Sequence, residues 1–264
     1  MSLPLCGLCV LRFFALKWWD GAPLGRLKCR HATEPRRFRL ESQWSSSPWQ
    51  RRLKMATFHH HFRKRDPLLH AAIKQIGPYN LKPSRDRFGM LVRSIISQQI
   101  SVGAARSIRQ KLETLVGEGG ITPAAIASQP PDKLRAVGLS PQKASYLVDL
   151  AGKVNSGEVR LARIGRLNDE QVIAELTQIK GIGIWTAQMF LIFALGRPDV
   201  FPLDDFGVRA AIARLYGYDE HPPKARLIEI GQSWSPFASI GSWYCWRYLE
   251  LLKQQKLDGK QYPV

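Results

Sequence analysis

Two adjacent carboxylates at the end of a strongly apolar stretch are the first candidates for chemistry in this sequence. Residues 179–205 read IKGIGIWTAQMFLIFALGRPDVFPLDD, so Asp204 and Asp205 close a segment that begins with two turn glycines. A carboxylate can act as a general base or stabilise a developing positive charge. Aspartate is also a preferred N-cap, and DDFGVRAAIARLYG predicts a helix that starts here. The residue types alone leave catalysis and helix capping open.

The glycines of KGIG indicate a second kind of site, one for anions. Gly181 and Gly183 separate two predicted helices, so we expect a tight hairpin in which both glycines adopt backbone angles closed to other residues. The N–H groups that open the second helix have no partners within it and favour a phosphate. Lys180 is either a phosphate contact or a solvated charge. The Thr186 hydroxyl could contact phosphate or bond back within its helix.

The composition favours a polyanionic partner without proving one. The 264 residues hold 39 Lys and Arg against 21 Asp and Glu, a formal net charge of +18. Such a balance is typical of proteins that bind nucleic acid or an acidic membrane surface, but it can also serve solubility alone. A chain of this length is large enough to bury a real hydrophobic core.

The first 54 residues differ from the rest in pattern and in charge. They carry 11 basic and 3 acidic side chains, a net of +8, which leaves +10 for residues 55–264. Charges interrupt the apolar start, so it makes a poor signal peptide or membrane span. The arginine-rich stretch that follows weakly resembles an organellar transit peptide. We expect residues 1–54 to be a disordered basic extension outside the folded domain, with Met55 as an alternative start. Three of the four cysteines lie there, which leaves Cys245 for the domain and fits a reducing compartment.

The pattern from Met55 onward predicts helices. One predicted helix shows the spacing of a single buried face, formed by Phe88, Leu91, Val92, Ile95 and Ile96.

Cap signals mark further helix starts, with Thr122 before Pro123 and Ser140 before Pro141. No alternating run is long enough for a convincing strand. The sequence therefore predicts an all-α protein of about ten short helices.

Several of these stretches together resemble a known family. LTQIKGIGIWTAQMFLIFAL followed by DVFPLDD is similar to the signature of the helix-hairpin-helix (HhH-GPD) DNA glycosylases, above all to the 3-methyladenine DNA glycosylase II branch. LVRSIISQQISVGAA, VGLSPQKASYLVDLA and WSPFASIGSWYCWRYL resemble other parts of that branch in the same order, over roughly residues 66–250. The resemblance implies a two-lobed helical bundle with a helix-hairpin-helix motif and a Gly/Pro-rich loop that ends in a catalytic aspartate.

The resemblance also implies an activity, namely hydrolysis of the N-glycosidic bond of alkylated purines in double-stranded DNA, without metal or other cofactor. Asp205 aligns with the catalytic residue of the family and would stabilise the electron-poor sugar and activate water. A helix N-terminus would help to keep that carboxylate ionised, so catalysis and capping are compatible for Asp205. For Asp204 we expect capping alone.

A glycosylase must flip the base out of the duplex, and the resemblance assigns residues to that task. Trp185 and Trp246 match positions that line the base pocket of the family, although tryptophans at such places are commonly core residues. Met189 stands in the pocket where the branch often has tyrosine, and Ala238 stands where it often has arginine. Gln99, in ISQQIS, is our choice for the side chain that fills the gap in the duplex, the alternative being a solvated glutamine at a helix end.

Two variants of the family chemistry fit less well. Bifunctional glycosylase/lyases carry a lysine where this chain has Trp185, and the nearest lysine, Lys180, precedes the hairpin glycines. Members with an iron–sulfur cluster need four closely spaced C-terminal cysteines, whereas this chain offers Cys245 there.

A different class stays open, a helix-hairpin-helix module that binds DNA without cutting any bond. A metal-dependent nuclease is weaker, since no set of carboxylates accompanies the run His59, His60, His61 and His70 at ligand spacing. We expect a monomer in the bacterial cytoplasm, or in an organelle or the nucleus of a eukaryote, with no membrane partner. The residues do not indicate which alkylated base is preferred.

Overall fold

A computed structural model describes residues 55–257, and every regular element in that range is a helix. The predicted all-α class is therefore confirmed for this part of the chain, while the expectation for residues 1–54 lies outside it. The helices are α1 (Met55–Arg65), α2 (Pro67–Ile76), α3 (Arg87–Ser97), α4 (Val102–Val116), α5 (Pro123–Ala127), α6 (Pro131–Ala136), α7 (Pro141–Ser156), the short η3 (Ile164–Arg166), α8 (Asp169–Thr177), α9 (Ile184–Phe193), α10 (Phe206–Leu215), α11 (Lys224–Trp234) and α12 (Ala238–Leu257).

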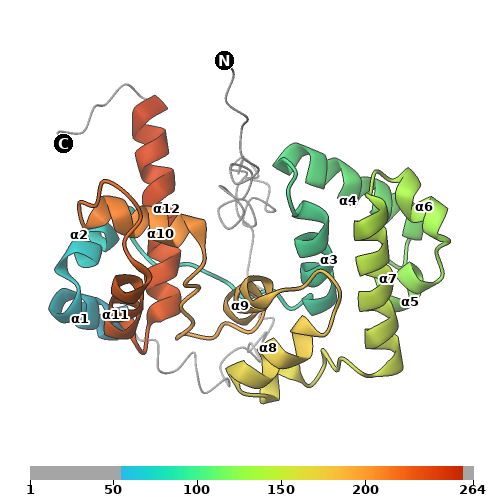
Figure 1. The fold of residues 1–264 in the computed structure, drawn as a ribbon, viewed down its shortest axis with the longest axis horizontal. Coiled ribbons are helices and arrows are strands. Elements are labelled where there is room, and N and C mark those ends of the chain that lie inside the picture. Colours follow the sequence, from blue (N-terminus) through green and yellow to red (C-terminus); the bar gives the residue numbers. More distant parts are fainter. Residues whose placement is uncertain (1–54, 258–264) are drawn as a thin grey trace, which may run out of the picture.

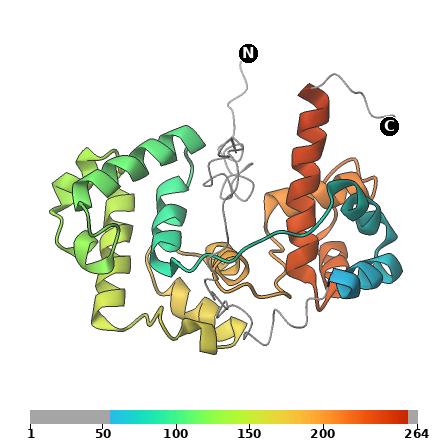
Figure 2. The same cartoon turned by 180° about the vertical axis from the view of Figure 1, so that it is seen from behind.

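The helices form two lobes, as the resemblance implied (Figure 1). The terminal lobe consists of α1, α2, α10, α11 and α12, and the middle lobe consists of α3 to α8. Helix α9 lies between the lobes and packs on α8 and α3. Figure 2 shows the extended segment 77–86 crossing from α2 in one lobe to α3 in the other. The chain thus passes twice between the lobes, once before α3 and once around α9.

Helix starts follow the cap residues that the sequence indicated. The Thr122 hydroxyl accepts the Ala125 N–H at the start of α5, and the Ser140 hydroxyl accepts the Lys143 N–H at the start of α7. A proline at the first helical position follows each cap, as predicted.

Helix α9 has no polar face, and elements of both lobes cover it. Six of its ten residues are buried, and they are Thr186, Ala187, Met189, Phe190, Leu191 and Ile192. A helix that is apolar all round must be enclosed by other elements, and here the two lobes enclose it. The chain that leaves α9 therefore enters the terminal lobe at its boundary with the middle lobe, where the carboxylate pair lies.

The long α12 completes the terminal lobe by packing on α2, α10 and α11. Trp234 and Tyr244 are the largest fully buried side chains of this lobe. Among helices within residues 55–257, none is both long and apolar enough to cross a membrane.

Candidate active site at the lobe junction

Asp205 is the N-cap of α10, and its carboxylate is buried where α9, α10 and α12 meet. Only 4% of the residue is exposed, and Oδ1 accepts the Val208 N–H at 2.8 Å. Asp204 is exposed and does not cap the helix, so the expectation that it would do so is wrong. The physical reason is register, since α10 begins at Phe206 and the cap position falls on Asp205.

Both tryptophans that the resemblance indicated contact this carboxylate. The Trp185 indole N–H, from α9, donates to Oδ2 at 2.8 Å, and the Trp246 indole N–H, from α12, donates to Oδ1 at 2.9 Å. Trp246 is 3% exposed and stacks on Phe193, with ring centroids 5.4 Å apart. Trp185 is partly buried. The role of these two side chains as aromatic walls for a base stays a prediction, and the geometry shows that both hold the carboxylate.

The partners of Asp205 suit its ionised form. Burial raises the pKa of Asp205 above its ordinary value, while N–H donors from Trp246, Val208, Trp185 and Gly207 act to lower it. All of these partners donate, and a protonated carboxyl would turn an O–H toward them without an acceptor. The fold thus surrounds a costly buried charge with the hydrogen bonds that it needs.

Gly207 is a residue of the site that sequence reasoning missed. A Cβ at this position would lie 2.9 Å from the Trp246 ring and 3.2 Å from Asp205 Oδ1. Any larger residue would push the indole and the carboxylate apart. The available signal was a glycine in the first turn of a predicted helix, DDFG, where glycine weakens the helix unless close packing requires it.

The hairpin connects α8 to α9 and is confirmed, but its two glycines serve different purposes. Gly181 has φ of 79°, and a Cβ there would overlap the Tyr146 ring. Gly183 has φ of −97° and ψ of 179°, which any residue can adopt, so the expected special angle is wrong for Gly183. Gly183 is exposed with open space around it, and no side chain caps the N-terminus of α9. The bare backbone leaves the N–H groups of Ile184 and its neighbours accessible to an anion.

The other predicted phosphate contacts lie beside this turn. Lys180 is exposed, and its backbone N–H donates to Asp149 Oδ2 at 2.9 Å. Thr186 is 6% exposed, so little of its side chain reaches the surface, and its contact with phosphate stays a prediction.

The two positions at which this chain differs from the usual residues of the 3-methyladenine branch, Met189 and Ala238, are both buried. Met189 is 2% exposed and belongs to the hydrophobic core, and its place in a base pocket stays a prediction. Ala238 is 3% exposed at the start of α12, where its N–H donates to Asp199 Oδ1 at 3.1 Å.

Gln99 lies at the turn between α3 and α4. It is exposed and has φ of 55°, a left-handed angle that is uncommon for a residue other than glycine. The preceding Gln98 donates its side-chain N–H to the Gly181 carbonyl at 2.8 Å. The turn that carries the predicted wedge is thereby tied to the hairpin.

No group of three or more His, Cys, Asp and Glu side chains in residues 55–257 is arranged to hold a metal ion. His61 Nε2 is bonded to the Ser233 carbonyl at 3.0 Å, and the rings of His59 and His70 lie 6.0 Å apart. Cys245 is a free, buried thiol.

The fold and site define a helix-hairpin-helix protein with a buried carboxylate at the junction of two helical lobes. The profile described as "HhH-GPD superfamily base excision DNA repair protein" matches residues 92–236. This chain belongs to that superfamily.

Named relatives agree with this assignment. The chain is 32% identical over 189 residues to DNA-3-methyladenine glycosylase 1 of Schizosaccharomyces pombe, a match that covers 70% of this chain and 83% of the relative. It is 28% identical over 196 residues to the DNA-3-methyladenine glycosylase of Bacillus subtilis, covering 70% of this chain and 65% of that relative. The chain thus spans slightly less than two thirds of the Bacillus protein.

A solved structure matches over most of the described fold. It is the Schizosaccharomyces pombe 3-methyladenine DNA glycosylase in complex with abasic DNA, with a TM-score of 0.65 and 30% sequence identity. The match covers 78% of this chain and 100% of that chain.

Proposed function

We propose that this protein is a monofunctional DNA glycosylase that removes alkylated purines of the 3-methyladenine type from double-stranded DNA. The observation that carries the proposal is the buried Asp205 carboxylate at the lobe junction, held by two indole N–H groups and the first turn of α10. The names of the relatives, which are DNA-3-methyladenine glycosylases, support the substrate class.

The chemistry needs little more than one well-placed anion. An N-alkylated purine is already cationic, so its bond to the sugar breaks with the electron pair moving onto the base and neutralising it. The sugar carbon becomes electron-poor, and a nearby carboxylate stabilises it. Water then adds to that carbon and gives its proton to the Asp205 carboxylate. The products are the free base and an intact strand with an abasic site.

The hydrogen bonds of Asp205 favour Oδ2 as the oxygen that faces the sugar. Oδ1 accepts from Val208 and from the buried Trp246, while Oδ2 accepts from the partly buried Trp185. A rotation of the Trp185 indole onto the flipped base would release Oδ2 toward the sugar and water. Stacking of a cationic purine on an indole face compensates for the lost hydrogen bond.

The remaining site residues would hold the DNA. The uncapped N-terminus of α9, behind Gly181 and Gly183, and the exposed Lys180 suit backbone phosphates. The exposed Gln99 suits the gap that the flipped nucleotide leaves. The net charge of +10 over residues 55–264 adds attraction that is independent of sequence.

Water is the nucleophile in this proposal because Trp185 stands where bifunctional relatives would have a lysine. We further propose that the protein acts as a monomer, in the compartment that holds the DNA, whether bacterial cytoplasm, organelle or nucleus. A DNA-binding module without catalysis would need neither indole on Asp205, so the presence of both hydrogen bonds favours the glycosylase.

The proposal is tested by free-base release. The full chain is incubated with duplexes that each carry one 3-methyladenine, 7-methylguanine, ethenoadenine or hypoxanthine, and the released base is measured by chromatography. We expect release from at least the cationic methylated purines and none from the matched undamaged duplex. Tight binding to all four duplexes without release from any would favour the non-catalytic module.

A further inference from the structure

One face of α7, formed by Lys143, Tyr146, Asp149 and Lys153, contacts the turn that carries Gln99 and the hairpin. Lys143 Nζ donates to the Ile96 carbonyl at 2.7 Å and to the Gln98 carbonyl at 2.6 Å. These carbonyls belong to the C-terminal end of α3, where carbonyl groups lose their partners within the helix. A lysine there both satisfies the carbonyls and interacts favourably with the negative end of the helix dipole.

The same face of α7 supports the hairpin further along. The Tyr146 ring fills the space beside Gly181 that a side chain would otherwise take. Asp149 accepts the Lys180 backbone N–H and pairs with Lys153 at 3.1 Å. Residues three or four apart share one face of a helix, so Lys143, Tyr146, Asp149 and Lys153 form a single row.

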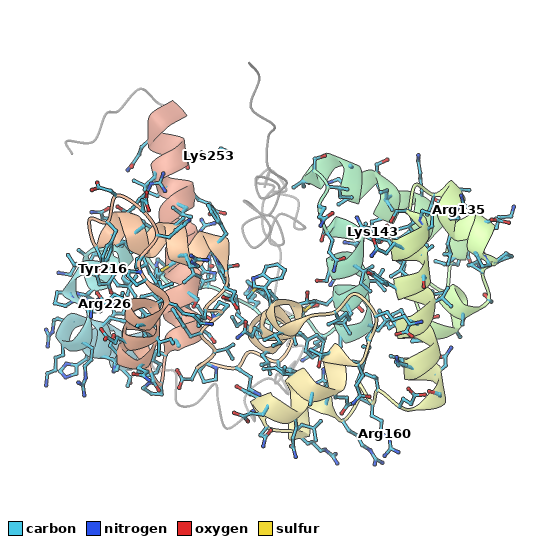
Figure 3. All side chains as sticks on the ribbon, in the orientation of Figure 1. Arg135, Lys143, Arg160, Tyr216, Arg226 and Lys253 are labelled. Atoms are coloured by element: carbon cyan, nitrogen blue, oxygen red, sulfur yellow. The ribbon has the colours of Figure 1, made fainter. Side chains whose placement is uncertain are left out.

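The two supported turns are also joined directly, through the Gln98 side chain and the Gly181 carbonyl. Lys143 is half-buried, and burial lowers its pKa. Figure 3 places it on α7 where that helix faces α3. The half-buried Lys143 ammonium holds two backbone carbonyls at the end of α3 through hydrogen bonds. Gln99, with its left-handed backbone angle, directly follows the second of these carbonyls.

We propose that Lys143 is a positioning residue for opening the duplex. It fixes the α3–α4 turn at a set distance from the hairpin, so that Gln99 enters the base stack while the hairpin grips the phosphates. This role rests on the proposed glycosylase function and adds a residue that touches neither the base nor the sugar. Its effect should be larger for a paired lesion, because flipping a paired base costs both unpairing and unstacking, whereas flipping an unpaired base costs unstacking alone.

The test compares one lesion in two pairing states. Single-turnover excision of 7-methylguanine is measured opposite cytosine and opposite a tetrahydrofuran abasic analogue, which cannot pair. Lys143→Met keeps the apolar stem but removes the donors. We expect excision of the paired lesion to fall about tenfold and excision of the unpaired lesion to change less than about twofold. Lys143→Arg, which can donate to both carbonyls, should restore most of the paired rate.

Lys153→Met is the matched control on the same helix. Lys153 donates to the Gln178 carbonyl and to Asp149, at the hairpin end of this face. Its loss should lower excision of both lesions by a similar factor, because hairpin contacts to phosphate do not depend on pairing. Gln99→Ala should reproduce the pairing-dependent loss, and combined with Lys143→Met it should add little further loss.

The outcomes are distinguishable from a failure of the proposed function. If the wild-type chain releases no base from either duplex, the glycosylase assignment itself fails. If it releases both but Lys143→Met slows both equally or neither, the positioning role is wrong and the assignment stands. Should Lys143→Met not fold, Gln98→Leu decides, since it removes the tie to Gly181 and should lower the paired rate selectively by a few fold. An equal loss on both duplexes in that variant would also overturn the proposal.

Discussion

Two aspartates buried within residues 55–257 share almost the same surroundings, but only Asp205 accepts a hydrogen bond from the helix between the lobes. Asp66 and Asp205 are each 4% exposed and each cap a helix, α2 and α10 respectively. Each also accepts an indole N–H, from Trp234 at 2.6 Å and from Trp246 at 2.9 Å. Burial, capping and an indole donor are therefore not marks of catalysis by themselves.

The difference lies in the last partner of each carboxylate. Asp66 accepts the Tyr216 hydroxyl, and that residue lies within the terminal lobe, as Figure 3 shows. Asp205 accepts instead from Trp185 on α9, between the lobes and partly buried. The side-chain donors to Asp66 both come from the terminal lobe, whereas Asp205 has one donor, Trp185, on the helix between the lobes. We propose that this position at the lobe junction, more than the hydrogen bonds themselves, makes Asp205 the reactive carboxylate and leaves Asp66 a structural one.

The largest effect is expected for Asp205→Asn. Excision of 7-methylguanine should fall about a thousandfold or more, because an amide can neither stabilise the sugar cation nor accept a proton. Binding to the lesion duplex should stay within a few fold, since the phosphate contacts lie elsewhere. Single-turnover rates and a binding titration measure the two quantities, and excision within tenfold of wild type would remove Asp205 from the mechanism.

The matched change Asp66→Asn should show the opposite pattern. It disrupts the hydrogen bonds from Trp234 and Tyr216 in a closed site, and we expect the free energy of unfolding to drop by about 2–4 kcal/mol. Excision per folded molecule should be unchanged. Denaturant unfolding and an active-site-normalised rate measure this, and an unfolding free energy equal to that of wild type would show that Asp66 is not the structural counterpart described above.

The pH dependence sharpens the comparison further. Burial raises the pKa of Asp205, so the acid limb of excision should lie at a higher pH than for an exposed aspartate, with the rate rising as the carboxylate ionises. The contribution of this raised pKa to the free energy of unfolding changes with pH in the opposite direction from the excision rate. A folded-state pKa above the unfolded one gives a contribution that is present below the unfolded pKa and lost as pH rises through the folded pKa.

Rates and unfolding curves from acid to neutral pH check this prediction. The stability of wild type relative to the non-titrating Asp205→Asn should decline across the window in which the wild-type rate rises. A constant difference, or an acid limb at the position of an exposed aspartate, would contradict a raised pKa.

The smallest effect is expected for Asp204→Asn. Its side chain is exposed and caps no helix, so both unfolding free energy and excision should stay close to wild type, within about 0.5 kcal/mol for the former. A loss of about 1 kcal/mol, the size of a helix cap, would move the start of α10 back by one residue. Thermal unfolding beside Asp205→Asn is the measurement.

The sequence predicted the parts that local chemistry determines. Ser or Thr before proline predicted the starts of α5 and α7, and the glycines predicted the hairpin. The family resemblance indicated Asp205, whose catalytic role stays a prediction. Neighbouring residues could not reveal which aspartate of the pair caps α10, because that depends on where the chain from α9 reaches the terminal lobe. Asp66 was not singled out, since a lone aspartate before a proline predicts only a helix start.

Side-chain partners from distant elements were likewise out of reach of the sequence. The indole hydrogen bonds of Asp205 join residues 20 and 41 positions away. Lys143 reaches carbonyls 45 and 47 positions away. Such contacts follow from how the helices pack, and no local pattern encodes them. The same holds for Gly207, whose need for glycine arises from the ring of Trp246.

The most direct test of the central claim, hydrolysis by water beside Asp205, is borohydride trapping during turnover on a 7-methylguanine duplex. We predict free base, an abasic strand that breaks only after hot alkali, and no covalent protein–DNA adduct, because no amine attacks the sugar. A trapped adduct that disappears in Lys180→Ala would contradict this claim, since a lysine beside the hairpin would then be the nucleophile.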